Sequence, residues 1–140
     1  MKFDAENTNK YFSFPVGQEH IEYLKRRQIT SAEYLDALQK DQYGYLRENM
    51  LLIQGKPYCL DCILGASSES ICDLIGTNDL YNLSAEVGTV FAVLLGDDYL
   101  FFKPNDPTVY FCCRDTDEII PMADSYSELQ KKIQYEEKWT

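Results

Sequence analysis

A Cys-x-x-Cys motif, Cys59 to Cys62, is the first pattern in this chain that suggests chemistry. Two thiols at this spacing form half of many zinc sites, and the same spacing occurs in redox pairs. The sequence has no second motif of this kind, and its single histidine is His20, so the other half of a zinc site is missing. A redox pair normally lies at the start of a helix, whereas residues 58–64 are predicted to form a strand.

The spacing of the cysteines also argues against a shared ligand. Side chains an odd number of residues apart in a strand point to opposite faces, so Cys59 and Cys62 are expected to diverge, as are the adjacent Cys112 and Cys113. We therefore expect reduced thiols, buried or half-buried, that behave as small apolar groups. No metal ligand, cofactor or catalytic residue is assigned. A metal-binding or redox protein that uses Cys59 and Cys62 is kept as an alternative.

His20 is a candidate general base by residue type alone. It lies between Glu19 and Glu22 in a charged segment with no nucleophile near it in the sequence. Nothing in the chain completes a Ser-His-Asp or Cys-His arrangement. We expect a histidine that faces solvent, and a protein that is not an enzyme.

Paired carboxylates form the remaining candidates for chemistry. Asp97-Asp98 and the pair Asp115 and Asp117 could serve acid–base or cation-binding roles. Each pair lies between two runs of strand-forming residues, where aspartate is an ordinary turn former. Turns carried by a rigid sheet are also common sites of recognition, so a role in binding a partner is compatible with the role in the turn.

The elements that would position these carboxylates are a meander of strands and a closing helix. Residues 89–95 form a continuous apolar run, as expected of a central strand covered on both faces. Aromatic runs at 99–103 and 108–113 predict two more strands, and residues 118–120 predict another. Ser125 and Glu128 stand at capping-box spacing, which predicts a helix over Ser125–Gln134.

The N-terminal half is predicted to be mainly helical. We expect a helix over Glu19–Arg27, and a second helix that begins with a capping box at Thr30 and Glu33. Apolar residues then recur with helical spacing at Tyr34, Leu35, Leu38, Tyr45, Leu46, Met50 and Ile53. After the strand at 58–64, Ser67 is expected to cap a helix over Glu69–Ile75, with a break at residues 76–78. These elements predict one α+β domain over residues 1–140, with N-terminal helices, an antiparallel or mixed sheet of about five to six strands and a C-terminal helix.

Residues 89–134 contain a series of motifs in a fixed order: a Gly-Asp turn, an aromatic strand, an Asn/Asp/Pro turn, VYF, an acidic turn, EIIP, ADS and a closing helix. This order resembles the SUKH superfamily (Smi/Knr-like). Residues 63–71 resemble the strand–loop–helix that enters this region in the family. The Asn-Gly-Gly sequence of the family is absent, and its glycine-rich loop is reduced to Gly96-Asp97-Asp98. The superfamily includes fungal regulators of cell-wall glucan synthesis and bacterial immunity proteins that neutralise polymorphic toxins, so the resemblance implies a binding domain.

Charge is distributed very unevenly along the chain. Residues 57–130 contain thirteen acids and two bases, whereas the other residues contain eleven bases and ten acids. A field of one sign repels nucleic acid and anionic lipid and attracts a basic partner, although a solubilising surface is a simpler explanation. The sequence has no apolar run of the roughly 18–20 residues that a membrane helix needs, and its first residues do not resemble a signal peptide. We expect a cytoplasmic protein.

Together, the resemblance and the charge predict a non-catalytic immunity protein that binds and neutralises a basic toxin domain. The expected toxin is a nuclease. The predicted contact residues are Asp97, Asp98, Tyr99, Asp115, Asp117 and Glu118, and Tyr81 and Tyr99 are expected to be exposed. The alternative is a regulatory scaffold related to the glucan-synthesis regulators. Such a scaffold would be expected to carry long disordered flanks, so the small size of this chain favours the first hypothesis.

Overall fold

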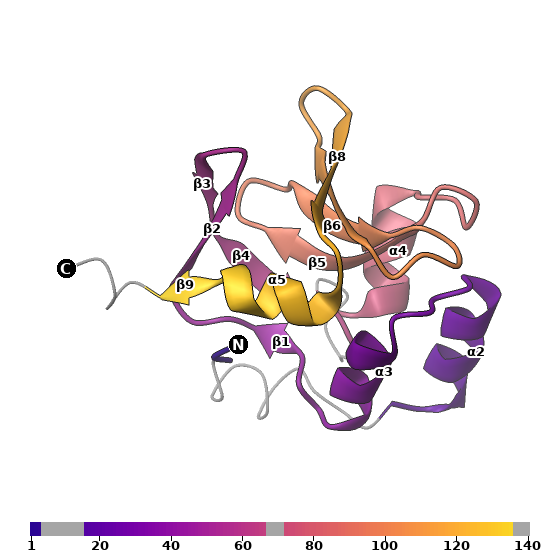
Figure 1. Cartoon of the computed structure of the whole chain (residues 1–140). Coiled ribbons are helices and arrows are strands. Elements are labelled where there is room, and N and C mark those ends of the chain that lie inside the picture. The colour runs from indigo at the N-terminus through magenta and orange to yellow at the C-terminus, as the bar shows by residue number, and fades with distance from the viewer. Residues whose placement is uncertain (4–15, 67–71, 136–140) are drawn as a thin grey trace.

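The computed structural model describes residues 1–3, 16–66 and 72–135, and these form an α+β fold, as the sequence predicted (Figure 1). The helices are α2 (Gln18–Arg26), α3 (Ala32–Gln39), α4 (Leu74–Tyr81) and α5 (Tyr126–Lys132). The strands are β1 (Gly44–Tyr45), β2 (Asn49–Ile53), β3 (Lys56–Tyr58), β4 (Leu60–Ile63), β5 (Thr89–Leu94), β6 (Tyr99–Phe102), β7 (Val109–Cys113), β8 (Glu118–Ala123) and β9 (Gln134–Tyr135). No helix in these residues is long and apolar enough to cross a membrane.

The strands form two antiparallel sheets. Six strands pair in the order β1-β4-β5-β6-β7-β8, and a smaller sheet has the order β3-β2-β9. Successive strands from β5 to β8 are neighbours, so the predicted meander is confirmed. Since each strand reverses direction, the β5–β6 and β7–β8 turns lie at one end of the sheet and the β6–β7 turn lies at the other.

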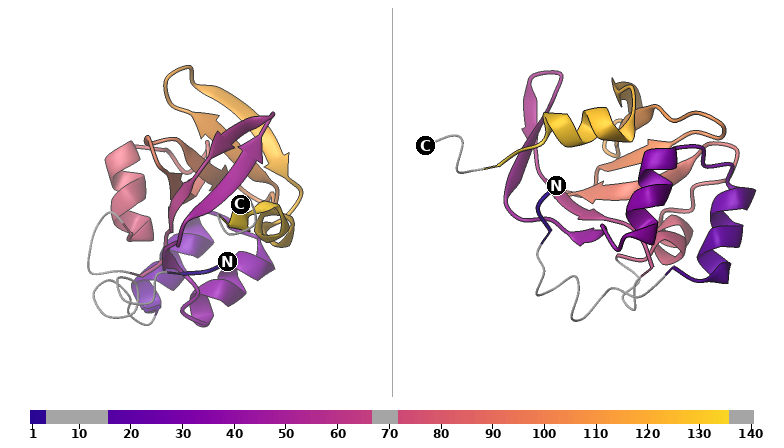
Figure 2. Two further views of the ribbon diagram at one scale, coloured as in Figure 1. Left: turned by 90° about the vertical axis from the view of Figure 1, so that its left-hand side faces the viewer. Right: turned by 60° about the horizontal axis from the view of Figure 1, so that its bottom comes forward.

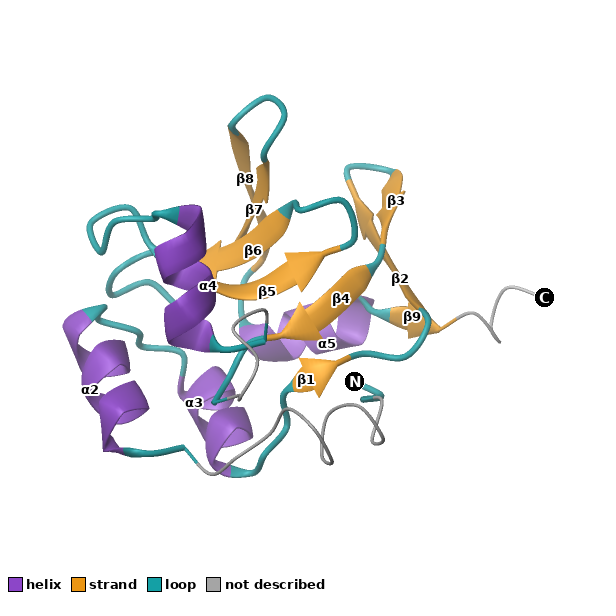
Figure 3. Cartoon of the chain, turned by 180° about the vertical axis from the view of Figure 1, so that it is seen from behind, coloured by secondary structure: helices purple, strands orange, loops and turns teal. Residues whose placement is uncertain are grey.

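Helices cover both faces of the large sheet, as Figure 3 shows with α4 in front of the sheet and α5 behind it. On one face, Tyr34 of α3 and Tyr126 of α5 pack against Phe91 of β5, with ring centroids 5.3 and 5.8 Å away. Phe91 also stacks on Phe102 of β6 at 4.2 Å. Every residue of β5 is buried, which confirms the prediction of a central strand covered on both faces.

The prediction of a helix that continues from Tyr34 towards Ile53 is wrong. The helix α3 ends at Gln39, Asp41 has a φ of 55° and Gly44 has a φ of 117°, so the chain leaves the helical conformation twice within a few residues. Residues 44–45 and 49–53 are strands instead. Gln54 and Gly55, with φ values of 50° and 79°, form the turn between β2 and β3, because two successive positive φ values suit a two-residue hairpin. Tertiary pairing has overridden a helical pattern of apolar residues.

The capping residues also differ from the prediction. Ser31, and not Thr30, caps α3 by accepting a hydrogen bond from the backbone N–H of Tyr34 (3.2 Å). Glu33 turns away from this cap and accepts hydrogen bonds from the backbone N–H and the hydroxyl of Ser127 in α5. The two helices on this face of the sheet are thereby joined through one carboxylate.

No break occurs at residues 76–78, because α4 runs through them. Asp73 caps this helix by accepting a hydrogen bond from the backbone N–H of Gly76 (3.0 Å). Asn78, only 1% exposed, donates to the carbonyls of Leu74 and Val90 and accepts from the backbone N–H of Val90, so its amide joins α4 to β5. The predicted cap at Ser67 and residues 69–71 of the predicted helix lie outside the described residues. In the described part, helical structure begins only at Leu74, the first residue of α4.

The closing helix is confirmed in position and is shorter than predicted. The hydroxyl of Ser125 accepts a hydrogen bond from the backbone N–H of Glu128 (3.2 Å), as the capping-box spacing requires. The helix ends at Lys132, and residues 134–135 then pair with residues 49–50 as β9 (Figure 2).

Candidate protein-binding site at the acidic end of the sheet

The first acidic turn connects β5 to β6. The backbone N–H of Asp97 donates to the carbonyl of Leu94 (3.2 Å), with Gly96 at a φ of 94° and Asp97 at 71°. Aspartate tolerates this left-handed conformation better than most residues. The side chain of Asp97 is exposed and makes no hydrogen bond or ion pair with another described residue.

The second acidic turn connects β7 to β8. The backbone N–H of Thr116 donates to the carbonyl of Cys113 (3.3 Å), and Asp117 has a φ of 57°. A turn that ends with a residue in the left-handed region is a common hairpin connection. All residues from Arg114 to Glu118 are exposed.

One hydrogen bond joins the two turns. The carboxylate of Asp98 accepts from the backbone N–H of Arg114 (3.0 Å), although the two residues are sixteen positions apart. The structure therefore brings together the five predicted acidic contact residues, which we call the acidic end: Asp97, Asp98, Asp115, Asp117 and Glu118. Arg114 is the only base within these two turns.

The expectation that Tyr99 is exposed is wrong. Tyr99 pairs with Val93 on one side and Cys112 on the other, and it is only 9% exposed. Its ring packs on Tyr81 of α4, with the ring centroids 5.3 Å apart, so it lies between the sheet and the helix. Tyr81 is partly exposed, and the guanidinium of Arg114 lies over its ring at 4.7 Å. An aromatic strand at a buried position has the same sequence pattern as one at an edge, which explains the error.

Tyr58 is a neighbour of the acidic end that the sequence did not reveal. Its ring packs on Phe111 of β7, with the centroids 4.9 Å apart, which places β3 of the small sheet beside the large sheet. Burial raises the pKa of the Tyr58 hydroxyl, and the carboxylate of Asp98 raises it further. Similarly, burial and then Asp97 raise the pKa of Tyr81. Both tyrosines lie within the field of the acidic end.

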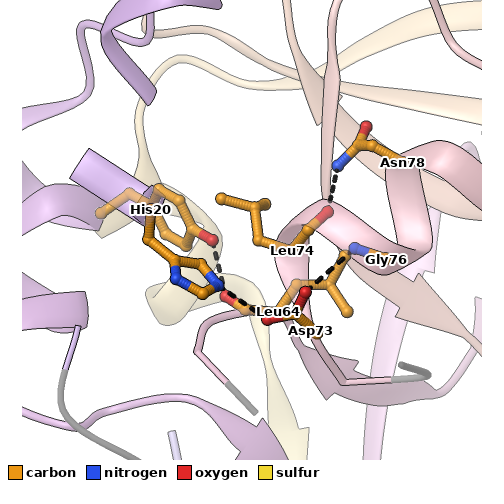
Figure 4. A network of polar contacts seen from close by, with 7 residues as sticks. His20, Leu64, Asp73, Leu74, Gly76 and Asn78 are labelled. Carbon is orange, nitrogen blue, oxygen red and sulfur yellow. Dashed lines mark hydrogen bonds and ion pairs between the residues drawn. The ribbon is translucent and has the colours of Figure 1, made fainter. Parts of the chain in front are cut away.

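His20 does not face solvent, contrary to the prediction. Its Nε2 lies 2.7 Å from a carboxylate oxygen of Asp73, and the two side chains are only 15% and 17% exposed (Figure 4). Because Asp73 also caps α4, the pair attaches α2 to the start of that helix. No sequence signal links residue 20 to residue 73, and neither lies in the acidic turns.

The two thiols of the Cys-x-x-Cys motif have different partners. Cys59 is half-buried and its thiol donates to the carbonyl of Asn49 (2.9 Å), whereas Cys62 is fully buried. A side-chain hydrogen bond with Cys72 and burial raise the pKa of the Cys62 thiol, which disfavours the reactive thiolate. Within residues 1–3, 16–66 and 72–135, no three His, Cys, Asp or Glu side chains are grouped to hold a metal ion.

Comparisons with protein-family models, curated proteins and solved structures found no match to this chain.

Proposed function

We propose that this chain is a non-catalytic binding domain that neutralises a basic toxin domain, a nuclease in the first instance, by covering its substrate site with the acidic end. The observation that carries the proposal is the hydrogen bond from Arg114 to Asp98, which holds two acidic turns side by side. The SUKH resemblance of residues 89–134 supports the same function, because these residues form both turns.

Charge and exposure support a protein partner. The side chains of Asp97, Asp115 and Asp117 are exposed and make no hydrogen bond or ion pair with other residues in the described part of the chain. A nuclease binds a polyanion through a basic surface, and an acidic inhibitor presents the same sign of charge to that surface. Complementary charge raises the association rate, and occupation of the substrate site needs no chemistry by the inhibitor.

The test begins with capture of proteins from lysates of the source cells and their close neighbours on the immobilised chain, at low and then moderate salt. A captured basic protein is purified and assayed for nuclease activity with and without the chain. We expect stoichiometric inhibition by the wild-type chain. Retention only at low salt indicates non-specific attraction, because exposed charges are screened as salt rises. Stable binding of a basic partner without inhibition favours the regulatory scaffold.

Backbone geometry determines which acids should be changed in this test. Asp97 and Asp117 have positive φ values, and Asp98 accepts a backbone hydrogen bond, so lysine at any of these positions would also disturb a turn. Asp115 and Glu118 have neither constraint. The variant Asp115→Lys/Glu118→Lys therefore reverses charge at the acidic end with the least disturbance of its backbone.

A further inference from the structure

A pocket of about 500 Å³ lies next to the acidic end, between α4 and the β5–β6 turn. Its walls include Leu80 and Leu95, which are 75% and 61% exposed, far more than is usual for leucine. Asp97 from the first acidic turn lines it, as does Asp61 from β4. A neighbouring hollow of about 370 Å³ shares Asp61 and Leu95, so these two residues form the boundary between the two depressions.

Asp61 enters this pocket because β4 is irregular there. Leu60 pairs with Leu94 and Cys62 pairs with Val93, so Asp61 is an extra residue in β4. Such a bulge redirects a side chain and is a recurrent feature next to functional sites. The carboxylate of Asp61 is half-buried and forms no hydrogen bond or ion pair with the other residues that the structure describes. Burial raises the pKa of Asp61.

The charge and polarity of the lining residues indicate which kind of group the pocket can bind. Two carboxylates in the lining disfavour an anion. A purely apolar group would bury the carboxylate of Asp61 further and offer it neither a hydrogen bond nor an opposite charge. Such burial costs free energy. A long cationic side chain satisfies both kinds of wall, because its methylene stem can pack on leucine while its charged end meets a carboxylate. The one base in the lining, Arg114, is already held over the ring of Tyr81.

We propose that this pocket is the anchor site for a single lysine or arginine side chain of the protein partner, with Asp61 as the carboxylate that receives the charge and Leu80 and Leu95 as the walls for the stem. This inference rests on the proposed function for the source of the side chain, because it deepens binding at the same end of the sheet. The acidic turns attract a basic surface at long range, whereas the pocket would fix one residue of that surface in position.

The direct test uses N-acetyl-arginine amide as the probe and N-acetyl-norleucine amide as the matched neutral probe. Backbone amide shifts are recorded on the ¹⁵N-labelled chain during titration. We expect the arginine probe to shift the amides of residues 80, 95, 96 and 97 and to saturate with a dissociation constant on the order of 10 mM. Asp61→Asn should raise this dissociation constant at least about fivefold. The control variant is Asp41→Asn, which should leave the constant unchanged, because Asp41 is exposed and has a positive φ that asparagine tolerates.

A second variant keeps the test decisive if Asp61→Asn is poorly folded. Leu95→Lys changes an exposed side chain and places a cation at the wall of the pocket, so it should compete with the probe. Equal binding of the two probes, or an unchanged constant in folded Asp61→Asn and Leu95→Lys, would overturn the inference.

Failure of the inference is separable from failure of the proposed function. If Asp115→Lys/Glu118→Lys weakens binding of the captured toxin and Asp61→Asn does not, the anchor site is refuted and the function stands. If the captured toxin is inhibited equally by the wild type and the charge-reversed variant, the role of the acidic turns is refuted instead.

Discussion

The turns at the two ends of the meander contain similar residues, but the aspartate at one end is hydrogen-bonded within the protein and most of the aspartates at the other end are exposed. In the β6–β7 turn, Asp106 accepts hydrogen bonds from the backbone N–H of Thr108 (2.9 Å) and from the hydroxyl of Tyr110 (2.7 Å). The next residue back, Asn105, donates from its backbone N–H to the carbonyl of Gln28, just after α2 (2.9 Å). We call this the docked end, because the turn is attached to the helices.

At the acidic end, by contrast, Asp98 is the one carboxylate of the five that accepts a hydrogen bond from the backbone of the residues that the structure describes. A carboxylate that already accepts two hydrogen bonds has fewer lone pairs left for a partner than an exposed carboxylate, which can exchange its water for a cation. The comparison teaches that the number of acids in a turn does not identify a binding surface. The two ends differ in the share of carboxylate oxygens that the fold leaves to solvent.

Charge reversal at the acidic end should have the largest effect. We expect Asp115→Lys/Glu118→Lys to slow association with a basic partner about 10- to 100-fold, because complementary charge acts mainly on the association rate. The unfolding free energy should change by less than about 0.5 kcal/mol, since both side chains are exposed. Rates are measured by surface plasmon resonance at two salt concentrations.

The matched control for this prediction is Glu86→Lys/Asp124→Lys. Both acids are exposed, and they lie before β5 and after β8, at the opposite ends of those strands from the acidic turns. An equal loss of rate in the control would mean that net charge, and not the acidic end, determines association.

The next prediction concerns the contact between His20 and Asp73, which attaches α2 to the start of α4. Asp73→Ala removes both the cap of α4 and the contact with His20, and should cost about 2 kcal/mol of unfolding free energy. His20→Ala leaves the cap in place and should cost about half as much. Urea unfolding followed by circular dichroism measures both, and an equal cost would show that the cap contributes nothing.

The carboxylate of Asp106 should give the docked end a pH dependence. The hydrogen bond from Tyr110 lowers the pKa of Asp106. Because the pKa is lower in the folded state, the stabilisation is complete above the unfolded pKa and is lost as pH falls through the folded pKa. We expect Asp106→Asn to reduce the unfolding free energy by about 1 kcal/mol at pH 6. The difference in unfolding free energy between the variant and the wild type should become smaller towards pH 2. A difference that stays constant with pH would contradict this account.

Neutralisation within the acidic turns should have the smallest effect on folding. Asp97→Asn and Asp117→Asn keep a residue that tolerates positive φ, so each should change the unfolding free energy by less than about 0.5 kcal/mol. Asp97→Ala, which loses this tolerance, should be the less stable variant by about 0.5–1 kcal/mol. Thermal unfolding of the three variants compares them, and equal stability of Asp97→Ala and Asp97→Asn would show that the turn carries no such preference.

Local signals in the sequence were sufficient for the meander and its closing helix. The continuous apolar run at residues 89–95, the acidic turns and the Ser125 cap depend on neighbours in the chain, and each element was found where it was predicted. Residues 44–53 were not predictable in this way, because their apolar spacing fits a helix and only pairing with distant strands makes them β1 and β2.

The candidate site was predictable only in part, for the same reason. The sequence by itself determined where acids occur in turns, since turn chemistry is local and charge is a property of composition. Tertiary structure decided that Asp98 reaches Arg114, that Tyr99 is buried beneath Tyr81, that His20 meets Asp73, and that a bulge directs Asp61 into a pocket beside Leu95. Each of these contacts joins residues far apart in the chain, and their proximity is fixed by the register of the strands and by the packing of helices on the sheet.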